Sequence, residues 1–241
     1  MKNAFYIVGP TAAGKSELAA DVAHELGAEI INADAFQIYR GFDLLTGKPA
    51  PAVLGKAPHH LIGAIPVTEL MNAGKFRRKA LPVVEEIQAR GKHVLVVGGS
   101  GLYVKALTHG LDSDWKESET DPKGVFVFHD RDKLYQRINA RVERMFKNGV
   151  VEEVRAVGVV SATAEKMIGL REIRQLLDGE MSISECSAAI QQVTRRYSKR
   201  QLTWFRHQTN FEPLNLSLLT HSEAVTWISR KARLAFAQGN D

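Results

Sequence analysis

A glycine-rich loop near the start of the chain combines the residue types needed to hold a phosphate group. It follows an apolar run, precedes a helical pattern and fits the spacing G-x-x-x-x-G-K-[ST] with Gly9, Pro10, Thr11, Ala12, Ala13, Gly14, Lys15 and Ser16. Backbone N–H groups and the following helix N-terminus can surround an anion, Lys15 adds a full charge, and the Ser16 hydroxyl can bind Mg²⁺. The strand–loop–helix context argues against a chance glycine-rich turn. The loop therefore predicts binding of a di- or triphosphate, without specifying the reaction.

Asp34 comes just after a second apolar run, Glu29–Asn32. In an open parallel sheet the carboxyl ends of the strands line the ligand crevice, so we expect Asp34 close to the phosphate loop. A carboxylate there could take a proton from a nucleophile or hold Mg²⁺ through water. The alternative is an aspartate that caps the turn following it.

Ser100 belongs to a second glycine-rich segment, which ends the apolar run His93–Val97 at the same expected edge. Its hydroxyl could contact a phosphate oxygen or Mg²⁺, or it could cap the helix that follows. Kinases and NTPases with such a phosphate loop usually end a strand with an aspartate for the Mg²⁺ water. The Gly-Gly-Ser ending counts to a small degree against NTP hydrolysis.

These loops need an alternating set of strands and helices to bring them together. Apolar runs and helical periodicity predict the strands Phe5–Val8, Glu29–Asn32, His93–Val97 and Val125–Phe128, and the helices Lys15–Leu26, Phe76–Arg90 and Leu102–His109. The segment 39–66 is rich in Gly and Pro and predicts loop with short strands. The alternation predicts an α/β fold, a P-loop NTPase-like parallel sheet flanked by helices.

The pattern becomes helical after residue 132. Helices are expected at Leu134–Lys147, from the capping box Ser182–Glu185 to Trp204, and over Ser222–Gln238. We therefore expect a P-loop α/β core at 1–132 and a mainly helical C-terminal part at 133–241, packed on the core as one compact domain. Candidate linkers are Asp112–Lys123 and Val157–Ala164.

The expected helix ending at Trp204 belongs to a segment, 186–211, that contains no acidic residue. Its basic residues are Arg195, Arg196, Lys199, Arg200 and Arg206. A helical projection places Arg195, Lys199 and Arg206 on one side, and on the other Ile190, Val193, Tyr197 and Trp204. This pattern predicts an apolar inward face and a cationic outward face suited to a phosphate backbone. An ordinary solvated face is the alternative.

Composition excludes several classes of protein. The chain has 241 residues, 44% hydrophobic and 24% charged, which is typical of a globular protein and not of a disordered one. No apolar stretch approaches the roughly 20 residues of a membrane span, and the N-terminus lacks a signal-peptide pattern, so we expect a cytoplasmic protein with no membrane contact. The single cysteine excludes an intrachain disulfide, and the net charge of +5 permits an anionic partner.

A set of ordered motifs resembles the tRNA dimethylallyltransferase family. Besides the phosphate loop they are Asn32–Asp34, Gln37–Gly41, Thr46–Pro49, Pro58–Leu61, Phe76–Arg78, Val97–Tyr103, Ile168–Glu172 and Tyr197–Arg206. The resemblance spans residues 9–206. It implies transfer of a dimethylallyl group from dimethylallyl diphosphate to N6 of an adenosine beside the anticodon, with release of diphosphate. It also implies Mg²⁺, dimethylallyl diphosphate and the anticodon arm of tRNA as partners, and we expect a monomer.

The resemblance also assigns roles to single residues. Asp34 matches the proposed general base, Ser100 a hydroxyl that contacts diphosphate and metal, and Arg171 a basic position near the diphosphate. Thr11 to Ser16 match the diphosphate-binding segment, and we expect the whole loop Gly9 to Ser16 to bind, with Lys15 as catalytic cation and Ser16 and Ser100 as metal ligands. Expected tRNA contacts are Asp34, Ala35, Phe36, Gln37, Ser100, Arg195, Lys199, Arg200 and Arg206. The family's loop is commonly described as ATP-binding, although this transfer needs no ATP.

The chain departs from the family pattern in one large respect. Family members usually carry a mostly helical insertion that clamps the anticodon arm, and here only Leu111–Lys123 fill that place. Gly63 and Leu170 replace a usual Asp and Tyr. The short connector leaves open a prenyltransferase acting on free AMP or ADP, although such enzymes generally lack the Tyr197–Arg206 run. A P-loop small-molecule kinase and an inactive RNA-binding remnant are the remaining alternatives.

Overall fold

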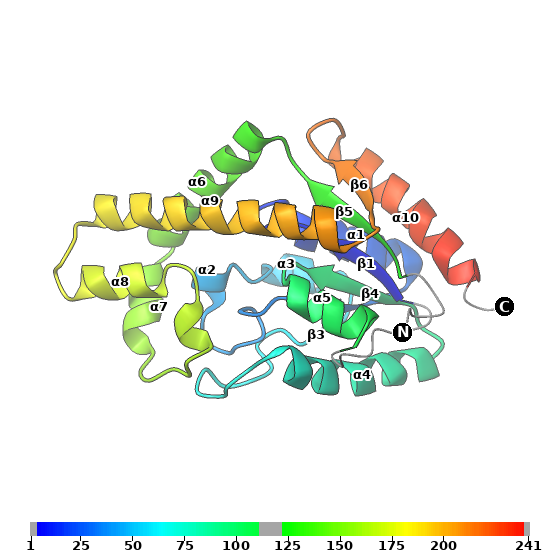
Figure 1. The fold of residues 1–241 in the computed structure, drawn as a ribbon, viewed down its shortest axis with the longest axis horizontal. Helices are drawn as coiled ribbons and strands as arrows, with labels where there is room; N and C mark the ends of the chain where they lie inside the picture. Colours follow the sequence, from blue (N-terminus) through cyan, green and yellow to red (C-terminus); the bar gives the residue numbers. More distant parts are fainter. Residues whose placement is uncertain (1–3, 111–121, 239–241) are drawn as a thin grey trace.

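A six-stranded parallel sheet forms the centre of the structure, a computed structural model that describes residues 4–110 and 122–238 (Figure 1). The strand order is β3-β2-β4-β1-β5-β6, and every neighbouring pair is parallel. The strands are β1 (Ala4–Val8), β2 (Glu29–Asn32), β3 (His59–His60), β4 (Val94–Gly98), β5 (Lys123–Phe128) and β6 (Glu212–Asn215). The expected α/β fold with a parallel sheet is confirmed.

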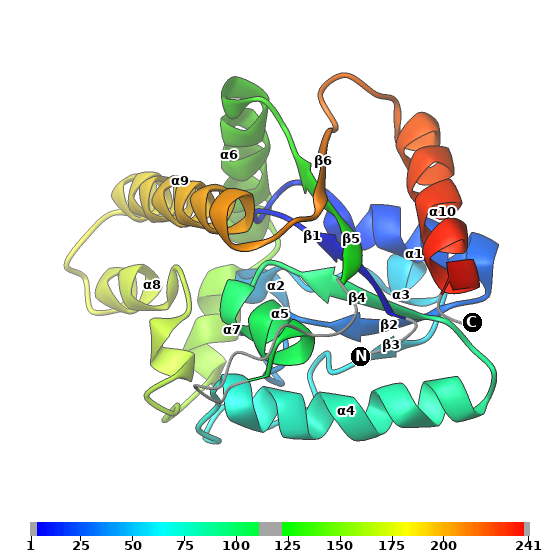
Figure 2. The same ribbon diagram turned by 45° about the vertical axis from the view of Figure 1, so that its right-hand side comes forward.

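Alternation along the buried strands divides the core between the two faces of the sheet. Every residue of β1 and β4 is buried, as expected for strands covered on both sides. Phe5 and Ile7 face α1 (Lys15–Leu26) and α10 (His221–Gln238), whereas Tyr6 and Val8 face the opposite core. Figure 2 shows α1 and α10 together on one side of the sheet.

The opposite face is covered by α4, α5 and the helices between β5 and β6. Their bounds are α4 (Ala73–Ala89), α5 (Gly101–Thr108), α6 (Arg131–Lys147), α7 (Val150–Ala156), η1 (Ala164–Lys166), α8 (Leu170–Leu177) and α9 (Ile183–Gln208). The loop after β2 adds the short helices α2 (Asp43–Thr46) and α3 (Pro51–Leu54). The long helix α9 packs against α6, α8, α5 and β5, so it bridges the C-terminal helices and the sheet (Figure 1).

The start of α4 and the end of α9 differ from the expected helix ends. α4 begins three residues earlier than predicted because the Asn72 side chain accepts a hydrogen bond from the Lys75 N–H, 2.9 Å away. The capping box of Ser182 and Glu185 is confirmed, and α9 continues beyond Trp204 to Gln208. The short elements α7, α8 and β6 were not predicted.

The expected linker Val157–Ala164 is irregular but is tied to the core. The Ser161 N–H donates to the Val67 carbonyl at 2.8 Å, and the hydroxyls of Tyr39 and Thr163 lie 2.7 Å apart. The other expected linker, 112–123, lies outside the described residues except for its last two. In the ranges 4–110 and 122–238, no helix has the length and apolar character to cross a membrane.

Register brings the ends of β1, β2 and β4 together. Val8 pairs with Gly98, and Asn32 pairs with Val97. Beyond the strands, the Ala33 N–H donates to the Val97 carbonyl at 2.7 Å, and the Ser100 N–H donates to the Ala33 carbonyl at 3.2 Å. The phosphate loop, Asp34 and the Ser100 loop therefore leave the sheet side by side.

Gly98 permits this close approach, and replacing it with alanine should destabilise the protein. A β-carbon there would overlap the backbone of Ala33, the residue before Asp34. We expect Gly98→Ala to lower the free energy of unfolding by about 1–3 kcal/mol, measured by urea denaturation. Gly158→Ala is the matched control because a β-carbon at Gly158 meets nothing within 4 Å. Equal stability of the two variants would contradict this packing.

Candidate active site

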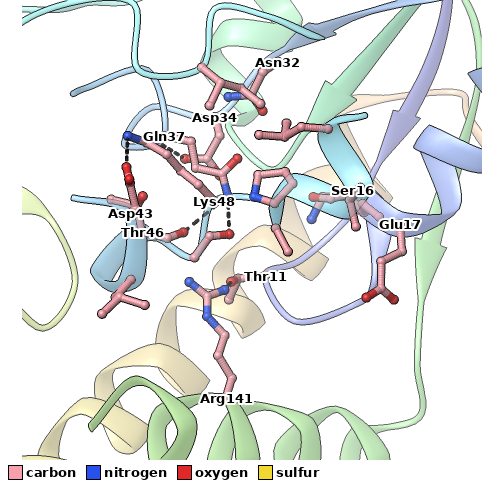
Figure 3. Close-up of a pocket in the computed structure, with 18 of the residues that line it drawn as sticks. Thr11, Ser16, Glu17, Asn32, Asp34, Gln37, Asp43, Thr46, Lys48 and Arg141 are labelled. Atoms are coloured by element: carbon pink, nitrogen blue, oxygen red, sulfur yellow. Dashed lines mark hydrogen bonds and ion pairs between the residues drawn. The ribbon is translucent and has the colours of Figure 1, made fainter. Parts of the chain in front are cut away.

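A cavity of about 1110 Å³ opens at the carboxyl edge of the sheet. The segments that line it include the phosphate loop, the end of β2 with Asp34, the loop 40–54, the end of β4 and one side of α6. Figure 3 shows side chains from these segments converging, with Arg141 of α6 directed toward Thr11. The structure therefore brings the phosphate loop and Asp34 to one site, as the sequence predicts.

The phosphate loop presents its cation at the cavity. Gly14 has a positive φ of 90° at the start of α1, a conformation that glycine adopts without strain. Lys15 and Ser16 follow and line the cavity. The Lys15 ammonium donates to the Pro10 carbonyl at 2.7 Å, so it lies against the loop that it serves.

Burial lowers the pKa of Lys15 to about 8; the charge of Asp34 opposes this shift, and that of Arg141 adds to it. Desolvation disfavours the charged ammonium, which explains the direction. Lys15 is thus cationic below pH 8 and loses its charge as the pH rises through that value. A bound anion favours the charged form, because opposite charges stabilise each other.

This pKa predicts a pH dependence of anion binding. We expect the affinity for inorganic diphosphate to fall by up to about tenfold per pH unit above the pKa of Lys15, and to be steadier below it. Titration calorimetry in Mg²⁺-free buffer between about pH 7 and about pH 9.5 measures this fall. Lys15→Arg is the reference because arginine stays charged throughout this range. Ionisation of diphosphate itself affects both proteins equally, so the difference between their pH profiles reports the titration of Lys15. Identical pH profiles for the two proteins would contradict the prediction.

Asp34 caps its own turn and still borders the cavity. Its Oδ1 accepts hydrogen bonds from the Phe36 N–H at 2.9 Å and the Gln37 N–H at 3.2 Å, so the capping interpretation is confirmed. The same side chain lines the cavity, and its charge shifts the pKa values of Lys15 and Arg141. Capping and chemistry are therefore compatible, with capping fixing the orientation of the carboxylate.

The Gln37 side chain binds the backbone at the end of α2. Its side-chain amide donates to the carbonyls of Gly47 at 2.9 Å and Thr46 at 3.3 Å, and the side chain is buried (Figure 3). These bonds hold the segment after Asp34 against the end of α2. Gln37 thus shapes the cavity wall.

A small, mostly apolar recess of about 50 Å³ adjoins Asp34. Thr11, Asp34, Thr46 and Arg141 line both this recess and the main cavity. The apolar walls come from Phe36, Leu45, Val142, Met145, Met167, Ile168 and Ile190. The recess thus places apolar walls next to a carboxylate and a guanidinium.

Arginines of α6, which sequence reasoning missed, complete the cationic side of the cavity. The Arg141 guanidinium donates to the Thr11 hydroxyl at 2.7 Å, and Arg137 Nε donates to the Ala12 carbonyl at 2.7 Å. Burial lowers the pKa of Arg141, and the charge of Asp34 opposes this. Arg144 also lines the cavity. The spacing 137, 141 and 144 places the three on one helix face, a signal that was present in the sequence.

Arg171 and Ser100, both predicted to act at the diphosphate, do not line these cavities. Arg171 pairs with Glu172 at 3.0 Å, its side chain is 75% exposed, and it is absent from the residues that line the two cavities. Ser100 is also absent from those linings, although its backbone touches Ala33. Ser100 occupies the N-cap position of α5 without a side-chain cap hydrogen bond. The roles predicted for both residues stay predictions.

The predicted inward face of α9 was partly wrong. The buried residues are Cys186, Ile190, Thr194, Ser198, Gln201 and Phe205, whereas Val193, Tyr197 and Trp204 are half-buried. Arg195, expected on the outward face, is half-buried and donates to Asn139 of α6 at 2.6 Å. Lys199, Arg200 and Arg206 are exposed as predicted. Polar residues can face inward here because Gln201 bonds the backbone of two loops, while Thr194 and Ser198 bond carbonyls of their own helix.

Comparisons with known proteins agree with this arrangement. The model of the IPP transferase family matches residues 37–125 and 113–208. A tRNA dimethylallyltransferase of Akkermansia muciniphila is 34% identical over 84% of this chain and 90% of its own. One of Caulobacter sp. is 36% identical over 84% of this chain and 89% of its own.

Solved structures share the fold. The full-length tRNA isopentenylpyrophosphate transferase of Bacillus halodurans superposes with a TM-score of 0.89 and 26% identity, covering 100% of this chain and 98% of that one. A eukaryotic dimethylallyltransferase studied while acting on tRNA has a TM-score of 0.74 and 19% identity, covering 90% and 75%. The second likeness concerns the fold alone.

Some of these relatives contain residues that this chain lacks. The two segments of the family match meet at residues 113–125. The alignments with the two bacterial relatives run over 264 and 275 positions, more than the 241 residues present here. Those relatives therefore contain residues with no counterpart in this chain, which supports the expected loss of an insertion near Leu111–Lys123.

Proposed function

We propose a mechanism for this chain on the premise that it belongs to the IPP transferase family and is a tRNA dimethylallyltransferase. The donor is dimethylallyl diphosphate, and the acceptor is N6 of an adenosine beside the anticodon. The observation that supports this best is one cavity wall shared by the phosphate loop, Asp34 and the apolar recess. A diphosphate, a short hydrocarbon and a proton acceptor are the three things that the reaction requires.

The phosphate loop and the neighbouring cations bind the leaving group. Negative charge grows on the diphosphate as the bond between its oxygen and the allylic carbon breaks. Lys15, Arg141 and the loop N–H groups stabilise that charge, and they require no rearrangement during the reaction. The Ser16 hydroxyl at the cavity fits Mg²⁺, which takes few protein ligands beside phosphate oxygens and water. When bound there, Mg²⁺ supplies further charge neutralisation on the diphosphate.

The apolar recess accepts the hydrocarbon. Its walls of Leu, Met, Ile, Val and Phe exclude water from the allylic carbon while positive charge develops on it. Phe36 and Met167 lie in this wall, close to the polar residues Thr11 and Asp34. This arrangement keeps water from capturing the allylic group before the amine reaches it.

Asp34 takes the proton that the amine releases. The adenine amino nitrogen is a weak nucleophile, since its lone pair is delocalised into the ring. As the new C–N bond forms, one N–H proton passes to the Asp34 carboxylate and diphosphate departs with the bonding electrons of the broken C–O bond. Because both N–H groups of the turn donate to Oδ1, Oδ2 is our candidate acceptor of that proton.

Helix α9 supplies the surface for tRNA. Lys199, Arg200 and Arg206 are exposed and can neutralise backbone phosphates, which position an RNA without reading its bases. An adenosine stacked in the anticodon loop must be extruded to reach Asp34. The segment Asp34–Gln37, with Ala35 and Phe36 between, is our candidate for meeting the extruded base.

A transfer assay tests the proposal. Purified protein is incubated with labelled dimethylallyl diphosphate, Mg²⁺ and an unmodified tRNA that carries adenosine next to the anticodon. We expect label in that tRNA, and none in a control tRNA with guanosine at the same position. Label in both tRNAs would refute the proposed position.

Free AMP is the second acceptor to test. The shorter region near residues 113–125 is the observation that favours it, because the resemblance gives the missing insertion the task of holding the anticodon arm. The same assay with AMP in place of tRNA separates the two acceptors. We expect tRNA to be used in preference, since α9 retains its exposed cations.

A further inference from the structure

Gln201 lies on the inward face of α9, where that helix meets the loops of the active site. Its side chain is only 5% exposed. We propose that Gln201 is a positioning residue that makes the phosphate loop depend on the docking of α9, so that tRNA and diphosphate bind cooperatively. This inference rests on the proposed function, in which α9 carries the tRNA surface and the loop holds the diphosphate.

One side chain joins two loops that are distant in sequence. The Thr11 N–H donates to Gln201 Oε1 at 2.9 Å, and Gln201 Nε2 donates to the Gly99 carbonyl at 2.8 Å. Thr11 belongs to the phosphate loop, and Gly99 precedes Ser100. A neutral amide suits this place because it accepts one hydrogen bond and donates another from a single planar group.

The fit around this amide is tight. A β-carbon on Gly99 would overlap Gln201 Nε2, and one on Gly101 would overlap the ring of Trp204. Both glycines therefore allow α9 to lie directly on the loop after β4. A buried N–H or carbonyl left without a partner is destabilising, so the two loops and the amide favour staying together.

The outer side of the same helix faces solvent. Lys199 and Arg200 are exposed immediately before Gln201, and Arg206 is exposed one and a half turns later. A shift of α9 on binding RNA moves the buried amide together with the exposed cations, because all four belong to one 26-residue helix. The position of Thr11 then follows that of the amide. Arg141 is affected too, because its guanidinium donates to the Thr11 hydroxyl.

Such a link must act in both directions. If tRNA strengthens diphosphate binding, diphosphate strengthens tRNA binding by the same factor, and such factors are typically about 5–150-fold. Gln201→Met keeps the length and volume of the side chain but removes both hydrogen bonds. Gln201→Glu keeps the acceptor for Thr11 and loses the donor for Gly99. Gln192→Met, at an exposed position on the same helix, is the matched control.

Titration calorimetry with inorganic diphosphate, with and without an anticodon stem-loop RNA, tests the proposal. We expect the wild-type protein and Gln192→Met to bind diphosphate at least about fivefold more tightly when the RNA is present. In Gln201→Met this factor should fall to about one, with an unchanged affinity for the RNA alone, and Gln201→Glu should lie between.

The proposal is overturned if Gln201→Met keeps the wild-type factor, if the wild-type protein shows no such factor, or if neither variant at 201 melts cooperatively. In the last case the residue serves folding alone. Failure of the proposed function is a separate result, because it appears as absence of transfer to tRNA by the wild-type protein in the labelled assay.

Discussion

Asp34→Asn lowers kcat by about 10²–10⁴-fold in the transfer assay, which is the range expected for loss of a general base. The asparagine cannot accept the proton that the adenine amine releases. Its side-chain oxygen can still accept from the N–H groups of Phe36 and Gln37, so the turn remains closed. We therefore expect an unchanged melting temperature, and an affinity for inorganic diphosphate that does not fall, because the variant removes a negative charge from the cavity.

A second substitution separates chemistry from structure. Asp34→Ala removes both the base and the turn cap, so it should lose stability as well as rate. Asp178→Asn, at an exposed position away from the cavity, should leave both unchanged. If Asp34→Asn turned over at the wild-type rate, the carboxylate would not be the proton acceptor, whatever its place beside the phosphate loop.

The parts of this site that the sequence predicts are those encoded in one short segment. The phosphate loop is continuous from Gly9 to Ser16, and the strand before it and the helix after it have clear periodicity. Asp34 could be placed next to the loop because parallel strands end at a common edge. These inferences require only local patterns and one topological rule.

The residues that were missed act across long sequence separations. Arg141 reaches Thr11 from a helix 130 residues away, and Gln201 reaches the same residue from 190 residues away. On α6 an arginine row resembles an ordinary solvated helix face, because spacing does not indicate whether the face meets solvent or a cavity. The inward position of Gln201 was missed because a periodicity analysis assigns polar residues to the outside of a helix.

The same reasoning explains the error on α9. Apolar periodicity selected Val193, Tyr197 and Trp204 for the inside, but the helix rests on loops and not only on apolar side chains. Thr194 and Ser198 face inward because they bond their own helix carbonyls, Ile190 at 2.7 Å and Arg195 at 2.9 Å. Edge strand β6 was missed for a related reason: Glu212–Asn215 contains a proline and only one buried apolar residue.

Arg141→Gln should reduce kcat/KM by about 10²–10³-fold, the effect of removing one preorganised group that stabilises charge in a transition state. Arg141 lines both the cavity and the recess, and its hydrogen bond to the Thr11 hydroxyl aims it at the junction of the two. Arg141 forms no salt bridge with any residue that the structure describes. A half-buried guanidinium with no carboxylate on it favours an anionic ligand.

Two further substitutions decide between charge and shape. Arg141→Lys keeps the charge but not the planar fork, so it should recover part of the diphosphate affinity and less of the rate. Arg155→Gln, an exposed position on α7, is the control for loss of one positive charge. Initial rates over a range of dimethylallyl diphosphate concentrations give kcat and KM for each protein. If Arg141→Gln matched the control in both, the leaving group would be held by the loop and Lys15 alone, and the row on α6 would only support the loop.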